Sequence, residues 1–280
     1  MGGSDVNFEA GALPDSPLAA AIQQRDANIL QTVTDALRNR HVMLAYQPVV
    51  QARDVTKPAF FEGLIRVLDD TGRIVPAHEF IGTIENREEG RIIDSLALEY
   101  GMAALDANPG IRLSVNMSAR SIGYPAWERI LEEGLARDPR IGERLILEIT
   151  ESSAMAMPDL VVDFMARGHR AGIAFGLDDF GAGYTAFRYF KDFCFDMVKI
   201  DGSFIEGIHE DPDNQVLTEA LVSIARQFDM FTVAEGVQDR GEAEFLIEAG
   251  VDCLQGFLFG APRVAQRITM ENQSRTGFGT

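Results

Sequence analysis

Two apolar runs near the start of the chain decide the fold: "MLAYQPVV" (43–50) and "FFEGLIRV" (60–67), joined by "QARDVTKPA" (51–59). Each run has the length and the apolar content of a buried β-strand. The nine residues between them are too few for a helical crossover. We therefore expect these two strands to be antiparallel neighbours.

After this pair, strands and helices alternate. Six further apolar runs occupy residues 112–118, 144–150, 173–180, 195–201, 231–237 and 252–259. Helical patterns lie between most of the runs, at residues 79–105, 125–138, 158–172, 214–229 and 239–250. This alternation is typical of parallel βαβ units, and eight strands in this length favour a modified (β/α)8 barrel of the TIM type with one antiparallel strand. An open doubly wound sheet is the alternative.

The chain divides into four parts. Residues 1–16 have turn-forming composition and are expected to be a flexible lead, residues 17–40 an amphipathic N-terminal helix, 41–262 the barrel and 263–280 a C-terminal tail. The helix has two interpretations: it packs on the flank of the barrel, or it is a dimerising or signalling helix that joins an upstream sensor domain or partner.

Composition excludes several kinds of partner. The formal net charge is −18, from 25 basic and 43 acidic side chains, so we expect no DNA binding. No apolar run is long enough for membrane insertion, and the start lacks a signal pattern. Cys194 and Cys253 lie in apolar runs and are expected to be buried, reduced thiols. These observations together favour a cytoplasmic protein.

Polar residues recur at the ends of the predicted strands. They are Glu62, Asn116, Glu148, Asp178, Asp179, Lys199, Glu235 and Gln255. One such residue alone would usually be a helix cap or a solvated side chain. In a parallel barrel, however, the carboxyl ends of the strands meet at one face, and converging acids repel one another unless a cation holds them.

The types of these side chains indicate which cation. Carboxylate and amide oxygens are hard ligands, which favour Mg²⁺ or Mn²⁺ over zinc or copper. The adjacent Asp178 and Asp179 suit two metal ions roughly 3.5–4 Å apart, an arrangement that serves phosphoester hydrolysis. Neighbouring strand residues point to opposite faces, so we expect the chain to turn there, with Gly181 and Gly183 permitting the turn.

The motifs of the chain resemble those of a known family. "FEGLIR" (61–66) is similar to the signature of the EAL-domain cyclic di-GMP phosphodiesterases, with Gly63 where Ala is usual. The likeness covers about residues 40–262, in order, and continues through "YQP" (46–48), "VNMS" (115–118), "EITES" (148–152), "DDFGAGY" (178–184), "VKIDGSF" (198–204), "AEGV" (234–237) and "QGF" (255–257).

The resemblance implies a fold, a reaction and a set of residue roles. The family has a modified TIM barrel with one antiparallel strand, and it linearises cyclic di-GMP to pGpG. Lys199 would hold or polarise the attacking water, and Glu235 is a candidate water-orienting base. The implied ligands of the first metal are Glu62, Asn116, Glu148 and Asp178, those of the second are Asp178, Asp179 and Glu235, and the implied nucleotide contacts are Gln47, Leu64, Arg66 and Gln255.

The resemblance also implies a regulatory loop. The segment "DFGAGYTAF" (179–187), which contains Phe180, Gly181 and Gly183, corresponds to a loop that couples the metal site to a dimer interface in the family. Glu151 is similar to the residue that anchors this loop. The resemblance therefore implies a homodimer.

Two other functions are consistent with parts of the sequence. The chain could be a non-catalytic cyclic di-GMP receptor, which metal-dependent turnover would distinguish from an enzyme. "GAGYTA" (181–186), with Asp201 about twenty residues further on, also fits the fingerprint of an NAD-dependent oxidoreductase. That interpretation places Asp178 and Asp179 beside a pyrophosphate that they would repel.

Overall fold

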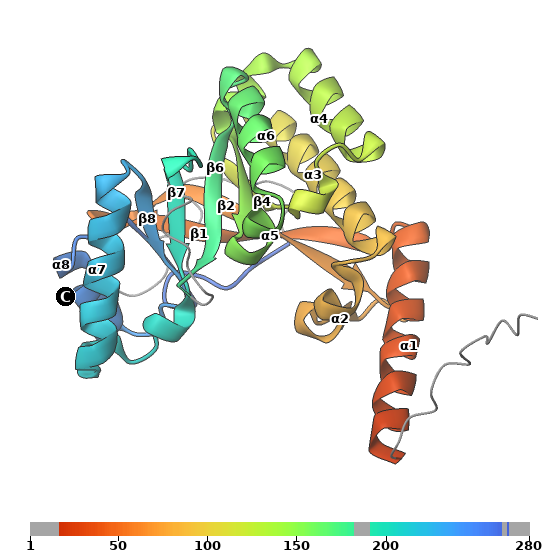
Figure 1. Cartoon of the computed structure of the whole chain (residues 1–280), viewed down its shortest axis with the longest axis horizontal. Helices are drawn as coiled ribbons and strands as arrows, with labels where there is room; N and C mark the ends of the chain where they lie inside the picture. Colours follow the sequence, from red (N-terminus) through yellow and green to blue (C-terminus); the bar gives the residue numbers. More distant parts are fainter. Residues whose placement is uncertain (1–16, 182–190, 265–267, 269–280) are drawn as a thin grey trace, which may run out of the picture.

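The fold is a closed β-barrel surrounded by helices (Figure 1). It is seen in a computed structural model that describes residues 17–181, 191–264 and 268. The order of strands around the barrel is β1-β9-β8-β7-β6-β5-β4-β2, and the pairing of β2 with β1 closes the ring. The predicted barrel is confirmed, and the open sheet is excluded.

One strand of the barrel runs against the others. β1 is antiparallel to both of its neighbours, β2 and β9, whereas the six other pairings in the ring are parallel. The single reversed strand is therefore confirmed. The strands are β1 (Val42–Gln51), β2 (Asp54–Leu68), β4 (Leu113–Asn116), β5 (Leu145–Thr150), β6 (Ala174–Phe180), β7 (Met197–Ile200), β8 (Phe231–Ala234) and β9 (Cys253–Gln255), and a short β3 (Ile74–Val75) pairs with β2.

The link between β1 and β2 is tighter than the sequence pattern indicated. β2 begins at Asp54 instead of residue 60, so Ala52 and Arg53 alone connect the two strands. The early part of β2 includes Lys57 and other polar residues that are largely exposed. Because Thr56 and Lys57 in this part of the hairpin face solvent, the apolar run that predicted the strand begins only at residue 60.

The helices lie outside the barrel. They follow the predicted segments, except that one predicted helix is divided into two. The predicted helix at 79–105 is two helices, because the backbone of Arg87 is extended and Gly90 packs directly against the Ile84 carbonyl. A short helix after β5 was not predicted. The helices are α1 (Pro17–Arg38), α2 (Ala77–Ile84), α3 (Glu88–Ala107), α4 (Pro125–Arg137), α5 (Glu151–Ala156), α6 (Pro158–Arg170), α7 (Pro212–Gln227) and α8 (Arg240–Glu248).

The inside of the barrel has an apolar floor. Side chains two positions apart on a strand point to the same side, so the apolar residues two positions from the strand-end polar residues also face inward. They form one buried cluster of Val49, Phe60, Ile146, Met197 and Val233. This cluster closes the barrel below the polar side chains and keeps water from passing through it.

Helix α1 packs on the flank of the barrel by its second half. Val33, Ala36 and Leu37 are buried against α2, α3 and β2. The first half of the helix extends past α2 in Figure 1. Flank packing is thus confirmed for the second half, and a signalling role for the whole helix stays a prediction.

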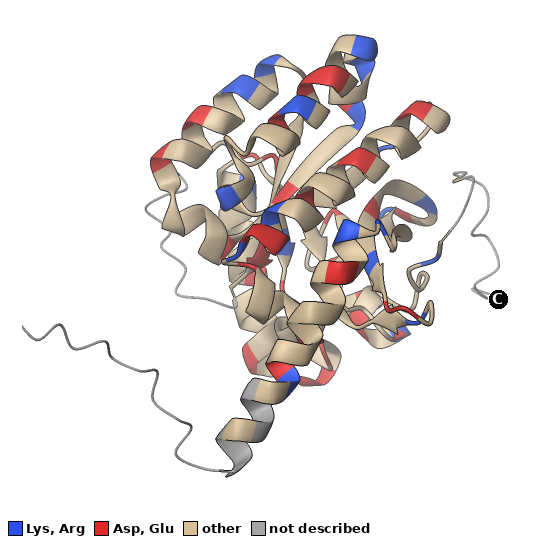
Figure 2. Ribbon diagram, turned by 90° about the vertical axis from the view of Figure 1, so that its right-hand side faces the viewer, with Lys and Arg blue, Asp and Glu red and all other residues tan. Residues whose placement is uncertain are grey.

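The surface bears on several of the expectations from composition. In the view of Figure 2, acidic and basic residues are intermixed along the helices. None of the helices in the described part of the chain has the length and apolar character that a bilayer crossing requires.

Cys194 is exposed and Cys253 is half-buried, so the expectation of two buried thiols is wrong. Cys194 lies between two buried phenylalanines but points outward from a loop.

A close backbone contact outside the barrel gives a test of the packing. A side-chain carbon at Gly142 would overlap the carbonyl oxygen of Ala171. We expect Gly142→Ala to lower the free energy of unfolding by about 1–3 kcal/mol, the usual cost of overpacking. The control is Gly82→Ala, where the added carbon meets open space. Urea denaturation of both variants is the measurement, and equal midpoints for the two would contradict the packing.

Candidate active site

The polar strand-end residues come together at one mouth of the barrel. A pocket of about 330 Å³ opens there. It is lined by Gln47, Glu62, Leu64, Asp178, Asp179, Lys199, Glu235, Gly236, Gln238, Gln255, Gly256 and Phe257. Asn116 and Glu148 lie behind this lining and contact it through hydrogen bonds. Arg66 is not among the lining residues; it lies further along β2 and is half-buried.

Lys199 is at the centre of the site. Its side chain is 1% exposed, and its Nζ lies 2.8 Å from Glu235 and 3.0 Å from Glu148. Asp178 at 3.1 Å and Glu62 at 3.4 Å complete a shell of four carboxylates. Burial would lower the pKa of Lys199, but the four negative charges outweigh burial and hold this pKa well above its usual value. The ammonium therefore stays charged.

Glu62 is held in place by two amides. Its carboxylate accepts hydrogen bonds from Asn116 Nδ2 at 2.8 Å and from Gln255 Nε2 at 2.6 Å. Gln255 also donates to Gln47, at 3.2 Å, and Gln47 donates to the Gly260 carbonyl. Burial favours the neutral acid, but Lys199 and these hydrogen bonds lower the pKa of Glu62 overall. Glu62 is thus an oriented carboxylate.

The pKa values of Glu148 and Glu235 are raised, whereas that of Glu62 is lowered. Burial raises the pKa of Glu148 well above its usual value, although Lys199 opposes this. One carboxylate oxygen, Oε1 of Glu148, is buried without a hydrogen-bond partner among the described residues. Burial, opposed in part by Lys199, raises the pKa of Glu235 to about 8. Both acids therefore favour a bound proton or an added cation.

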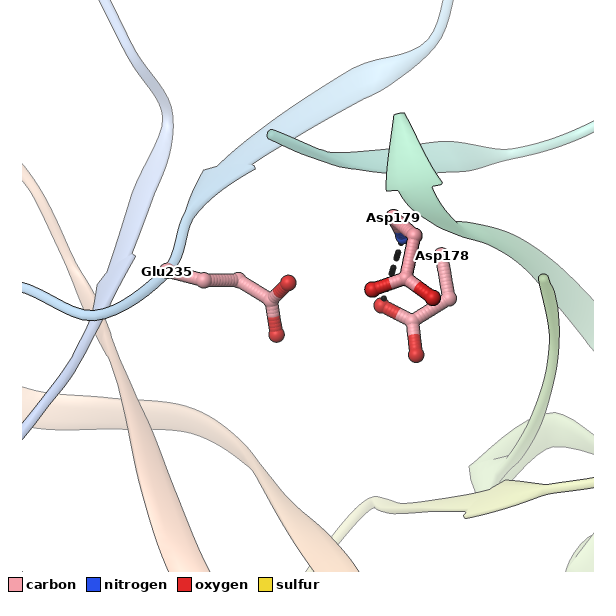
Figure 3. Close-up of side chains that lie close together, drawn as sticks. All are labelled: Asp178, Asp179 and Glu235. Atoms are coloured by element: carbon pink, nitrogen blue, oxygen red, sulfur yellow. Dashed lines mark hydrogen bonds between the residues drawn. The ribbon is translucent and has the colours of Figure 1, made fainter. Parts of the chain in front are cut away.

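Three carboxylates face one another at the open side of the site (Figure 3). Asp178, Asp179 and Glu235 each offer an oxygen within 4.8 Å of the others. These hard oxygen donors, together with the unpartnered oxygen of Glu148, fit divalent cations. The acids predicted at the strand ends therefore do converge, and their chemistry suits metal binding.

The backbone explains how two adjacent aspartates reach the same site. Asp179 has a φ of +57°, in the left-handed region, and the pairing of β6 with β7 is irregular between Leu177 and Phe180. The Asp179 N–H also donates to Asp178 Oδ1 at 3.1 Å. The turn thus begins at Asp179 itself, one residue earlier than Phe180, and the left-handed backbone of Gly181 agrees with the expectation that glycine permits it. Gly183 lies outside the described residues.

The predicted regulatory loop is described in part. Glu151 and Phe180 are buried, and Gly181 has a φ of +97° with the Phe204 ring packed against it. Gly183 lies outside the described residues, as does most of the segment 179–187. The coupling of this loop to a dimer interface therefore stays a prediction.

Sequence reasoning missed several residues of the pocket wall. Gly236 and Gln238 follow Glu235, and Gly256 and Phe257 follow Gln255. Phe257 is 70% exposed at the mouth. Each of these residues lies within three positions after a predicted site residue, so extending the site into the loops after β8 and β9 would have found them.

The charge balance of the site can be tested by removing the ammonium. Without metal ions, Lys199→Met leaves four carboxylates around an apolar side chain, and we expect a loss of about 3–5 kcal/mol in unfolding free energy. Urea denaturation in chelator at neutral pH measures this. Lys57→Met, which breaks an exposed ion pair with Asp54, is the matched control and should leave the midpoint unchanged. Equal stability of both variants would contradict the central role of Lys199.

Comparison with known proteins gives consistent matches. The family model described as the EAL domain matches residues 30–262. The chain is 31% identical over 234 residues to the signaling protein YkoW of Bacillus subtilis, which covers 81% of this chain and 29% of YkoW. It is 30% identical over 251 residues to MucR of Pseudomonas aeruginosa, named a bifunctional diguanylate cyclase/cyclic di-GMP phosphodiesterase, covering 88% of this chain and 36% of MucR. The chain thus spans about a third of the length of these relatives.

Solved structures agree with these matches. A structure described as the PaMucR phosphodiesterase in complex with c-di-GMP has a TM-score of 0.76 and 29% identity, covering 85% of this chain and 98% of that one. An EAL-domain protein from Listeria monocytogenes has a TM-score of 0.73 and 28% identity, covering 84% and 94%. Because the family model matches most of the residues and the barrel has the same fold, this chain belongs to the EAL-domain family.

Proposed function

We propose that this chain is a metal-dependent phosphodiesterase that hydrolyses cyclic di-GMP to linear pGpG. The observation that carries the proposal is the set of acids at the barrel mouth. Asp178, Asp179 and Glu235 converge within 4.8 Å beside a pocket, and Glu148 has a buried oxygen that lacks a partner among the described residues. Membership of the EAL family, with relatives named cyclic di-GMP phosphodiesterases, supports the choice of substrate.

The proposed cofactors are two Mg²⁺ or Mn²⁺ ions. Such a pair, when bound, clamps a phosphate, activates a water and stabilises the leaving oxygen. Asp178 belongs to both proposed ligand sets, since it lies beside both groups of acids. The first set is Glu62, Asn116, Glu148 and Asp178, and the second is Asp178, Asp179 and Glu235.

Lys199 and Glu235 would handle the attacking water. The Lys199 ammonium stays charged and lies 2.8 Å from Glu235, so both groups can contact one water molecule. Lys199 would donate to that water and orient it, and the Glu235 carboxylate is the candidate base. Loss of either group would leave the water poorly oriented.

The other side of the pocket would hold the nucleotide. Gln47, Leu64 and Gln255 line this side, and they offer amide and apolar surface instead of charge. Arg66, further along β2, would contact a phosphate or base that extends from the pocket. We also propose that the chain acts as a homodimer, with an upstream sensor domain or partner acting through α1.

The raised pKa of Glu235 predicts a pH dependence of metal binding. Below about pH 8 the metal-free site holds a proton on Glu235, and a metal ion must displace it. The apparent affinity for Mn²⁺ should therefore rise about tenfold per pH unit for each displaced proton and level off above pH 8. Calorimetric titration between about pH 6 and 9 checks this, and a flat profile would be incompatible with the protonated acid.

Turnover is the direct test. Cyclic di-GMP is incubated with the protein in Mg²⁺, in Mn²⁺ and in chelator, and the products are separated by chromatography. We expect metal-dependent pGpG. Because residues that merely support metal ligands cost about 10–100-fold when changed, Asp178→Asn should lower turnover by at least about a hundredfold. Asp163→Asn, on the exposed face of α6, is the control and should retain full activity.

A different result would change the class of the protein. Tight binding of cyclic di-GMP without product in either metal would make the chain a receptor. Absence of both binding and turnover would refute the proposal.

A further inference from the structure

A buried acid on α8 lies outside the metal cluster. Glu242 is 2% exposed, and its carboxylate accepts three backbone N–H groups. Oε2 accepts from Gln238 at 2.7 Å and from Asp239 at 3.2 Å, and Oε1 accepts from Gly207 at 2.9 Å. The Asp239 side chain in turn accepts from the Glu242 N–H, at 3.0 Å.

These contacts exceed what a helix start requires. Asp239 and Glu242 form a capping box, in which the glutamate needs to accept from the Asp239 N–H alone. The bonds from Gln238 and Gly207 are additional. They join two separate loops, because Gln238 follows β8 and Gly207 lies in the loop after β7. Glu242 therefore ties together the loops that follow Lys199 and Glu235 in the chain.

The loop after β8 is a wall of the pocket, and Glu242 controls one part of it. Glu235 is held by its N–H, which donates to the Ile200 carbonyl, and Val237 donates to the Gln255 carbonyl. The N–H groups of the next two residues donate to Glu242. Loss of the carboxylate would thus release Gln238, a residue that lines the pocket, and leave Glu235 in place.

We propose that Glu242 is a positioning residue for the substrate side of the site. It holds Gln238 at the pocket edge, where the amide contacts the bound nucleotide. This inference rests on the proposed function, which supplies the nucleotide. It predicts an effect on substrate binding and not on the metal ligands, since Glu242 contacts none of them.

The test is a pair of isosteric variants. Glu242→Gln keeps the size of the side chain and removes the negative charge of the carboxylate that accepts the three N–H hydrogen bonds. We expect KM for cyclic di-GMP to rise about tenfold, and kcat and the Mn²⁺ affinity to stay within about twofold. Glu244→Gln is the matched control, because Glu244 lies on the same helix and its ion pair with Arg240 is exposed. The control should have wild-type KM.

A double-mutant cycle shows whether Glu242 acts through Gln238. In a Gln238→Ala background, Glu242→Gln should raise KM by no more than about twofold, because the residue that it positions is gone. Unchanged KM in the single variant would overturn the inference. A full tenfold rise in both backgrounds, or a fall in kcat alone, would overturn it as well.

Hydrogen exchange separates this inference from the proposed function. The amides of Gly207, Gln238 and Asp239 should exchange faster in Glu242→Gln than in the wild type, and those of Ile200 and Val233 should not. Unchanged exchange would refute the positioning role even in an active enzyme. A wild-type protein that neither binds nor hydrolyses cyclic di-GMP would instead refute the proposed function, together with the role of Gln238 in contacting substrate.

Discussion

The buried ammonium of Lys199, surrounded by four carboxylates, is the interaction on which the site depends. Such a group can be buried at low cost only if its partners come from several directions, because one carboxylate would leave most of its hydrogens unpaired. A closed barrel meets this requirement, since every parallel strand delivers its carboxyl end to the same mouth. The apolar floor below, which includes Met197 and Val233, excludes water and so strengthens each of these charge interactions.

The reversed strand brings amide side chains to the second side of the site. Because β1 lies between β2 and β9, Gln47 is directly opposite Glu62 in the sheet, and Gln255 reaches both of them. These amides fix one face of Glu62 and leave the rest of the carboxylate to face Lys199. The site thus has an acidic side, from β5 to β8, and a side from β9, β1 and β2 where amide and apolar side chains accompany the single acid Glu62. The first side suits cations, and the second would hold the proposed nucleotide.

Much of this arrangement could be predicted from the sequence, and the exceptions have physical reasons. Apolar runs of strand length identified the eight barrel strands and placed Glu148 and Lys199 near strand ends, because a buried parallel strand requires apolar side chains on both faces. The left-handed backbone of Asp179 could not be predicted from the sequence, because Asp, unlike Gly, adopts a positive φ only occasionally. The start of β2 lacked an apolar run because Thr56 and Lys57 are exposed there, although Val55 packs against the core. Arg66 lies outside the pocket lining because its strand continues past the mouth.

The formal charge of the site is consistent with the two divalent ions of the proposed function. The five acids Glu62, Glu148, Asp178, Asp179 and Glu235, with the single ammonium, carry a formal charge of −4 when all are ionised. A cyclic dinucleotide adds two negative phosphates, and the chain as a whole, at −18, offers no compensating field. The raised pKa values of Glu148 and Glu235 show that protons reduce this excess in the absence of metal. Protons, however, cannot attract a phosphate once they are bound in neutral acids. In the proposed phosphodiesterase, these acids would hold two divalent cations that balance their charge and supply the positive charge that the phosphates need, so metal binding would favour phosphate binding as well as hydrolysis.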